Sequence, residues 1–133
     1  MVKIVIRAEA RFPVNRDRVR GAVGKVVDEY GVKEAVVNVI VVGKRQMAKL
    51  NRQWLGREGA TDVLSFPLED VESRESSQAG FVYPPDLPLM LGDVVVCWPE
   101  AIKQAAERNV LVDDEVAMLV EHGLRHLLGE HHD

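Results

Sequence analysis

Four histidines lie within the last twelve residues of this 133-residue sequence, at positions 122, 126, 131 and 132. At 3.6 residues per turn, His122 and His126 differ by one turn and about 40°, so a helix here points both imidazoles the same way. Gly129 permits a sharp turn that brings His132 back toward that helix face. The pattern His-x-x-x-His-x-x-Gly-x-x-His matches the metal ligands of the metzincin zinc proteases. The spacing therefore predicts a metal site formed by His122, His126 and His132.

Three imidazoles suit Zn²⁺, or nickel, and leave a fourth coordination position open to water. An open position is typical of a catalytic site. The proteases carry a glutamate directly after the first histidine as the general base, whereas this sequence has Gly123 there. A metal still lowers the pKa of its bound water and stabilises charge on a phosphoryl or carbonyl oxygen. We therefore expect a hydrolytic site that does not cleave peptides. The alternative is a cluster of surface histidines that binds no metal, and His131 is either solvated or a competing ligand.

Three blocks of the sequence resemble the YbeY family of metal-dependent endoribonucleases. They are Thr61–Pro67, Leu91-Gly92-Asp93 with the strand to Cys97, and His122–His132. The glycine after the first histidine belongs to this family's pattern. The resemblance implies a single domain with a zinc-binding helix, in which the three histidines named above are the ligands. It also implies cleavage of single-stranded RNA, linked to 3′-end maturation of 16S ribosomal RNA and to ribosome quality control, with the small ribosomal subunit as partner.

The sequence also departs from the family pattern near Gly56. Many members have an arginine immediately before that glycine, a residue thought to engage the phosphate, and here the position is Leu55. Arg57 and Arg52 are the candidates to replace it as catalytic residues. In addition, His131 stands where members usually have Asp, and the chain ends at Asp133 where many continue.

Two further functions compete with the endoribonuclease interpretation. Leu55 and the end at Asp133 motivate a ribosome-associated binding module with a structural metal and vestigial activity. Structural zinc usually has four protein ligands, often cysteines, and the sequence shows no such set. A metallopeptidase would need a general base from elsewhere in the chain.

The composition is that of one globular domain spanning residues 1–133. Hydrophobic residues make up 47% and there is one cysteine, so a core can form without disulfides. No apolar run reaches the roughly 20 residues of a membrane helix, and no signal-peptide pattern opens the sequence. We expect a cytoplasmic protein that does not bind membranes. Its oligomeric state is not indicated.

Charge divides the sequence at Arg57. Residues 1–57 hold 13 Lys and Arg against 5 Asp and Glu, whereas residues 58–133 hold 4 against 16. A basic half favours a polyanionic partner and an acidic half favours a cation. The expectation is that the basic residues of 44–57 border the metal cleft, namely Lys44, Arg45, Lys49, Arg52 and Arg57.

Hydrophobic periodicity predicts the elements that position these residues. Alternating or continuous apolar runs predict strands over 2–8, 36–42, 62–66 and 91–97. Helical spacing predicts a helix between Asn15 and Gly31, one through 47–54, one starting near Pro99, and a last one from Asp113 to Gly129. Residues 68–88 are predicted to form a long loop. The order indicates an α+β domain in which helices cover a mainly four-stranded sheet, with strand directions left open.

Four other residue types could suggest chemistry. Ser65 lacks the Gly-x-Ser-x-Gly context of a serine nucleophile, and Cys97 ends an apolar strand, which favours a buried, unreactive thiol. Asp62 and Asp93 are either strand-end turn residues or groups that support the metal ligands. Trp54 and Trp98 are predicted to lie in the core and not to stack on bases.

Overall fold

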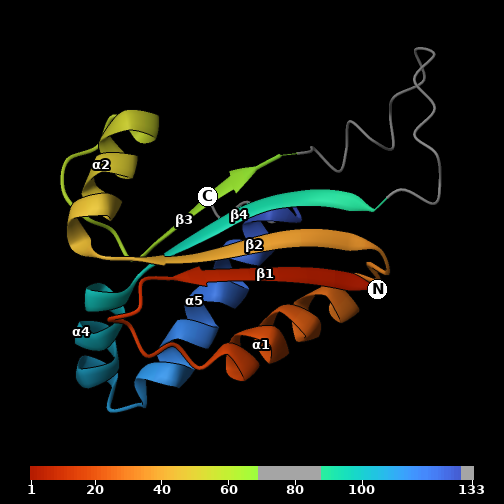
Figure 1. Ribbon diagram of the computed structural model, residues 1–133, viewed down its shortest axis with the longest axis horizontal. Coiled ribbons are helices and arrows are strands. Elements are labelled where there is room, and N and C mark those ends of the chain that lie inside the picture. Colours follow the sequence, from red (N-terminus) through yellow and green to blue (C-terminus); the bar gives the residue numbers. More distant parts are fainter. Residues whose placement is uncertain (69–87, 130–133) are drawn as a thin grey trace.

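The computed structural model describes residues 1–68 and 88–129, which form four strands and four helices (Figure 1). In chain order these are β1 (Val2–Ala8), α1 (Arg16–Glu29), β2 (Ala35–Val42), α2 (Lys44–Leu55), β3 (Val63–Pro67), β4 (Leu89–Cys97), α4 (Trp98–Arg108) and α5 (Val112–Leu127). The predicted order of elements is confirmed. The predicted long loop falls on residues 69–87, which lie outside the described residues.

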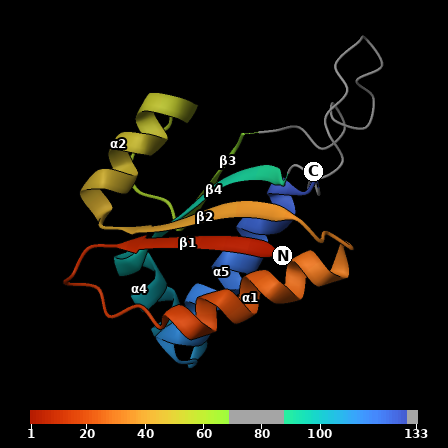
Figure 2. The same cartoon turned by 45° about the vertical axis from the view of Figure 1, so that its right-hand side comes forward.

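The four strands form one sheet in the order β1-β2-β4-β3. Strands β1, β2 and β4 are parallel, and β3 pairs antiparallel with β4 at the edge of the sheet. Helices α1 and α5 cover one face, and α2 stands on the other side near β3, as the two views agree (Figures 1 and 2). The sheet is therefore fully covered on one face and only partly covered on the other.

Local signals in the sequence set the helix ends. The side chain of Asn15 accepts a hydrogen bond from the backbone N–H of Arg18 and caps α1. Pro99 occupies the first turn of α4, where its missing N–H costs nothing. Three acidic residues in the first turn of α5 suit the positive end of its dipole. Gly56 adopts a left-handed conformation with φ of 64° and ends α2.

Alternation along the strands produces two hydrophobic cores. The larger one lies between the sheet and helices α1 and α5, and it takes Val94 and Val96 from β4. The smaller one lies between the sheet and α2, and it takes Val95 and Cys97 from the same strand together with Met47. Successive side chains of a strand point to opposite faces, so β4 contributes to both cores. The edge strand β3 does the same, and this places it between the two surfaces discussed below.

Trp98 is buried in the larger core with 6% of its surface exposed, as predicted. Trp54 is 63% exposed, so its predicted place in the core is wrong. The reason is the direction of α2, whose C-terminal end rises away from the strands in Figure 1. Met47, in the first turn of the same helix, is fully buried, whereas Trp54, two turns later, is largely exposed and contacts Phe66 of β3 with its ring edge-on.

Candidate active site

The two described histidines converge on one point. His122 and His126 lie one turn apart on α5, and their Nε2 atoms are 3.2 Å apart. The ring centroids are 4.7 Å apart and the rings are nearly perpendicular. Two nitrogens that each bind a tetrahedral zinc at about 2.0–2.1 Å are separated by about 3.3 Å. The observed distance therefore fits two ligands of one metal ion.

Both histidines line a pocket of about 270 Å³ between α5, β3 and the end of α2. Its lining residues are Leu55, Asp62, Val63, Leu64, Ser65, His122, Gly123 and His126. The fold thus brings the Thr61–Pro67 block, which contains β3, next to the histidine motif on α5. A half-enclosed pocket in which polar side chains converge between apolar ones is typical of a ligand site.

Gly123 allows α5 to approach the sheet at this pocket. A Cβ at this position would lie 2.7 Å from Cγ1 of Val94, 3.0 Å from Oγ of Ser65 and 3.2 Å from Cγ2 of Val63. The hydroxyl of Ser65 donates a hydrogen bond of 2.8 Å to the backbone carbonyl of Gly123. The glutamate that the proteases carry at this position would not fit, so the packing explains its absence. Ser65 thus holds β3 against α5, and the expectation that it is not a nucleophile stays a prediction.

A second glycine, Gly92, shapes the pairing of β4 with β3 next to the pocket. Gly92 has φ of 134°, and a Cβ there would lie 2.2 Å from the backbone oxygen of Phe66. Only glycine tolerates both the conformation and the contact. The Leu91-Gly92-Asp93 block therefore fixes how β4 meets β3.

Asp62 lines the pocket, and hydrogen bonds hold both of its carboxylate oxygens. Oδ1 accepts from the backbone N–H of Val63 at 2.8 Å, and Oδ2 accepts from the amide of Gln104 at 3.2 Å. Its backbone carbonyl also accepts from the N–H of Cys97. These bonds support the turn-residue interpretation of Asp62, which ties the start of β3 to α4 and β4.

Ion pairs hold α5 in place beneath the pocket. Arg125 contacts Glu29 of α1 at 3.1 Å, and Glu121 contacts Lys25 of α1 at 3.1 Å. Exposed pairs of this kind contribute little each, but the side chain of Glu121 is only 14% exposed. Together with the larger core they fix the helix that carries both histidines.

Burial affects the pKa of the single cysteine, Cys97. Cys97 is fully buried, and desolvation raises the pKa of its thiol above the ordinary value. A raised pKa leaves little thiolate at neutral pH, so the prediction of an unreactive thiol fits this environment.

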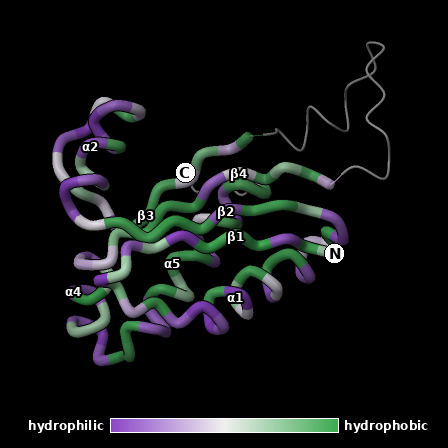
Figure 3. The backbone as a smooth tube through the Cα atoms, viewed as in Figure 1, coloured by the Kyte–Doolittle hydropathy of each residue, from purple (hydrophilic) through white to green (hydrophobic). Residues whose placement is uncertain are grey.

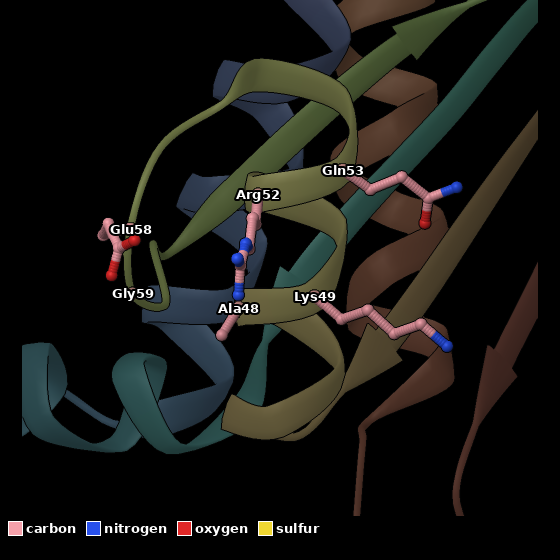
Figure 4. A pocket seen from close by; sticks show the side chains of 6 residues that line it. All are labelled: Ala48, Lys49, Arg52, Gln53, Glu58 and Gly59. Atoms are coloured by element: carbon pink, nitrogen blue, oxygen red, sulfur yellow. The ribbon is translucent and has the colours of Figure 1, made fainter.

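The cationic residues of α2 do not line the histidine pocket. Leu55 does, so the position where family members carry arginine is at the pocket but holds no charge. Arg52 instead lines a separate pocket of about 650 Å³ on the outer side of α2, with Lys49 and the Glu58-Gly59 turn (Figure 4). The expectation that the basic residues of 44–57 border the cleft is therefore not met by its lining. Arg57 is exposed just after α2, and its role stays a prediction.

The third predicted ligand, His132, lies outside the described residues, as does His131. Within residues 1–68 and 88–129, no group of three His, Cys, Asp or Glu side chains is arranged to hold a metal. The described part of the site thus contains two of the three predicted ligands, and the zinc-binding role of the C-terminal helix stays a prediction.

Sequence reasoning missed the role of Asn51. This side chain is buried, and its Nδ2 donates a hydrogen bond of 2.9 Å to the carbonyl of Gly59. It ties the turn between α2 and β3 back onto α2. An asparagine beside the apolar stripe of a helix was the available signal, because a buried amide requires a partner.

Comparisons with known proteins decide the family. The family model described as "Endoribonuclease YbeY" matches residues 6–133. The chain belongs to the YbeY endoribonuclease family. An Endoribonuclease YbeY of Salinispora tropica is 37% identical over 98% of this chain and 83% of that protein. One from Thermus thermophilus is also 37% identical, over 86% of this chain and 75% of that protein.

The fold agrees with this assignment. The solution structure of TM1509 from Thermotoga maritima superposes with a TM-score of 0.59 at 27% identity, covering 98% of this chain and 75% of that one. No helix in the described ranges is long and apolar enough to cross a membrane. YbeY membership identifies the chain as an endoribonuclease, and the histidine pocket is the candidate site for RNA cleavage.

Proposed function

We propose that this YbeY protein is a zinc-dependent, single-strand-specific endoribonuclease that acts in 3′-end maturation of 16S ribosomal RNA and in ribosome quality control. The small ribosomal subunit would be its partner and the cytoplasm its location. The observation that carries the proposal is the 3.2 Å approach of the two Nε2 atoms in a pocket, in a chain of an endoribonuclease family.

His122 and His126 would hold the ion together with His132, and nickel is the alternative to zinc. When bound, the ion supplies a water of lowered pKa and a positive charge against a phosphoryl oxygen. Ser65 and Gly123 keep the helix close to β3, which fixes the distance between the histidines and the wall of the pocket.

The remaining lining residues would orient the RNA. Val63 and Leu64 form an apolar wall that limits water around the reacting phosphate. Leu55 offers no charge to that phosphate, so Arg57 is the proposed cation, with Arg52 as the second candidate. A single strand suits this arrangement because the narrow pocket admits a backbone that can bend sharply, unlike that of a duplex.

The test is cleavage of a 16S 3′-terminal RNA with a single-stranded extension, and of the same RNA annealed to its complement. Wild type is expected to bind one zinc ion and to cut only the single-stranded form. His126→Ala should lose at least about 100-fold in rate, since even changes outside the ligand shell of a metal site cost roughly 10–100-fold. Met118→Ala, an exposed change on the same helix, is the matched control.

Metal content is measured by mass spectrometry for each variant. Equal cleavage rates for wild type and His126→Ala at matched zinc content would refute the catalytic role. Zinc binding without any cleavage would instead support the binding module with a structural metal, the alternative that Leu55 at the pocket favours.

A further inference from the structure

A second pocket lies on the other face of the sheet, under α2. It has a volume of about 590 Å³ and is lined mainly by apolar side chains of α2, β2, β3 and β4, including Ile40, Leu50, Trp54 and Phe66. Two polar side chains, Gln46 and Asp93, also line it. We call it the sheet-face groove. The histidine pocket is formed on the α5 side of β3, so the two are separate.

The groove exposes aromatic surface to solvent. Trp54 is 63% exposed, and its ring centroid is 6.2 Å from that of Phe66 with an interplanar angle of 63°. An exposed tryptophan beside an apolar groove costs free energy in water, which a bound planar group would recover. In an RNA-cleaving family, the planar groups available are the bases, and unstacked bases commonly stack on aromatic side chains.

Asp93 places a hydrogen-bond acceptor in this apolar setting. Its Oδ1 accepts a hydrogen bond of 2.8 Å from the amide of Asn38. Among the described residues no other side chain donates to this carboxylate, so Oδ2 can accept from a ligand. The Watson–Crick edge of guanine offers two adjacent donors to a carboxylate, whereas uracil offers one N–H between two carbonyls that a carboxylate repels.

The charges of α2 suit a polyanion. This helix contains Lys44, Arg45, Lys49 and Arg52 and no acidic residue, and it is drawn largely hydrophilic in Figure 3. Lys44 pairs with Glu100 at 3.8 Å. Within the described ranges Arg45, Lys49 and Arg52 form no ion pair. Lys49 follows Gln46, a residue of the groove, by three positions and lines the separate pocket on the outer side of α2, so its ammonium group is available to a phosphate just outside the groove.

The groove and the histidine pocket meet at the end of α2. Trp54 lines the groove and the next residue, Leu55, lines the histidine pocket. On β3, Phe66 lines the groove and Ser65 the pocket. A single strand that crosses the edge of β3 can therefore occupy both.

We propose that the sheet-face groove is a nucleobase subsite for single-stranded RNA, in which Trp54 stacks on a base and Asp93 favours guanine. This inference rests on the proposed function, because it assigns the neighbouring phosphate to the histidine pocket. It adds a binding site and a base preference that neither the metal nor the histidines provide.

The test measures binding of zinc-loaded protein to two fluorescent 2′-O-methyl RNA strands, U9 and U4GU4, whose integrity is checked on a denaturing gel. Trp54→Ala should weaken binding of both strands about tenfold, the usual effect of losing one stacked base. Trp54→Phe should remain within about threefold of wild type because it retains an aromatic face. Asp93→Asn should abolish the preference for U4GU4.

Ile102→Ala is the matched control, since it removes an exposed apolar side chain of α4 and should bind as wild type does. Wild-type affinity in Trp54→Ala would overturn the nucleobase subsite, whether or not the protein cleaves RNA. Weakened binding in Trp54→Ala without cleavage by wild type would overturn the proposed nuclease and leave the nucleobase subsite standing.

Discussion

The sequence was sufficient to place His122 and His126 at the histidine pocket, but not to place the cation that would replace the family arginine. A spacing of four on a helix fixes the relative direction of His122 and His126, so their convergence followed from local geometry. The substitute for the family arginine depends on how α2 ends and how the next turn runs. Arg52 differs from Leu55 by about 60° around the helix, which was enough to direct it to another pocket.

Leu55 leaves the histidine pocket without a cation at the position where many family members have arginine. Leu55→Arg should raise kcat/KM for RNA cleavage about tenfold, because a guanidinium at the pocket donates charge-assisted hydrogen bonds to phosphate. Leu55 is 47% exposed, so the longer side chain need not be buried. Steady-state cleavage of the single-stranded 16S fragment measures the effect.

The control for this prediction is Ile102→Arg, which adds the same charge on exposed α4. It should leave kcat/KM within about twofold of wild type. An equal rise in both variants would mean that overall charge, and not the position of the arginine, controls the rate.

At the level of elements, the contact between α5 and β3 sets the geometry of the histidine pocket. Three side-chain atoms surround the place where a Cβ of residue 123 would stand. The order of strands and helices was predictable because each element shows its own periodicity. The order of strands in the sheet, the antiparallel direction of β3 and the angle at which α2 leaves the sheet were not predictable, because they depend on contacts between residues distant in sequence.

Gly123→Ala should therefore lower stability although alanine is the better helix former. Overpacking typically costs about 1–3 kcal/mol, and the gain in helix propensity offsets about 1 kcal/mol of this. We expect a net loss of up to about 2 kcal/mol in the free energy of unfolding, with slower RNA cleavage because α5 is pushed away from Ser65. Urea denaturation and the cleavage assay measure the two effects.

Gly21→Ala on α1 provides the comparison, since nothing lies within 4 Å of its added Cβ. It should raise the free energy of unfolding by about 0.5–1 kcal/mol and leave cleavage unchanged. If Gly123→Ala proved equally stabilising, the close approach of α5 to β3 would not constrain the site.

Across the whole molecule, two helices of residues 1–57 carry four cationic residues each, α1 and α2, and their surroundings differ. On α1, Arg18 pairs with Asp114 at 3.6 Å and Arg20 pairs with Asp17 at 3.4 Å, so acidic neighbours offset these cations. On α2, Arg45 and Lys49 form no ion pair with any residue in the described ranges. Of these two helices, α2 therefore carries more cations without an ion-pair partner among the described residues, and it lies beside the sheet-face groove.

This division predicts which cations contact RNA. Each phosphate contact to a single strand contributes about 0.7 to the slope of log affinity against log salt concentration. The double change Arg45→Ala with Lys49→Ala should therefore reduce the slope by about 1.4, whereas Arg18→Ala with Arg20→Ala removes the same net charge from α1 and should leave it unchanged. Titrations of the U9 strand at several salt concentrations measure both. A slope that falls equally in the two variants would mean that RNA responds to the net charge of the molecule, and the surface of α2 would lose its assignment as the RNA-binding face.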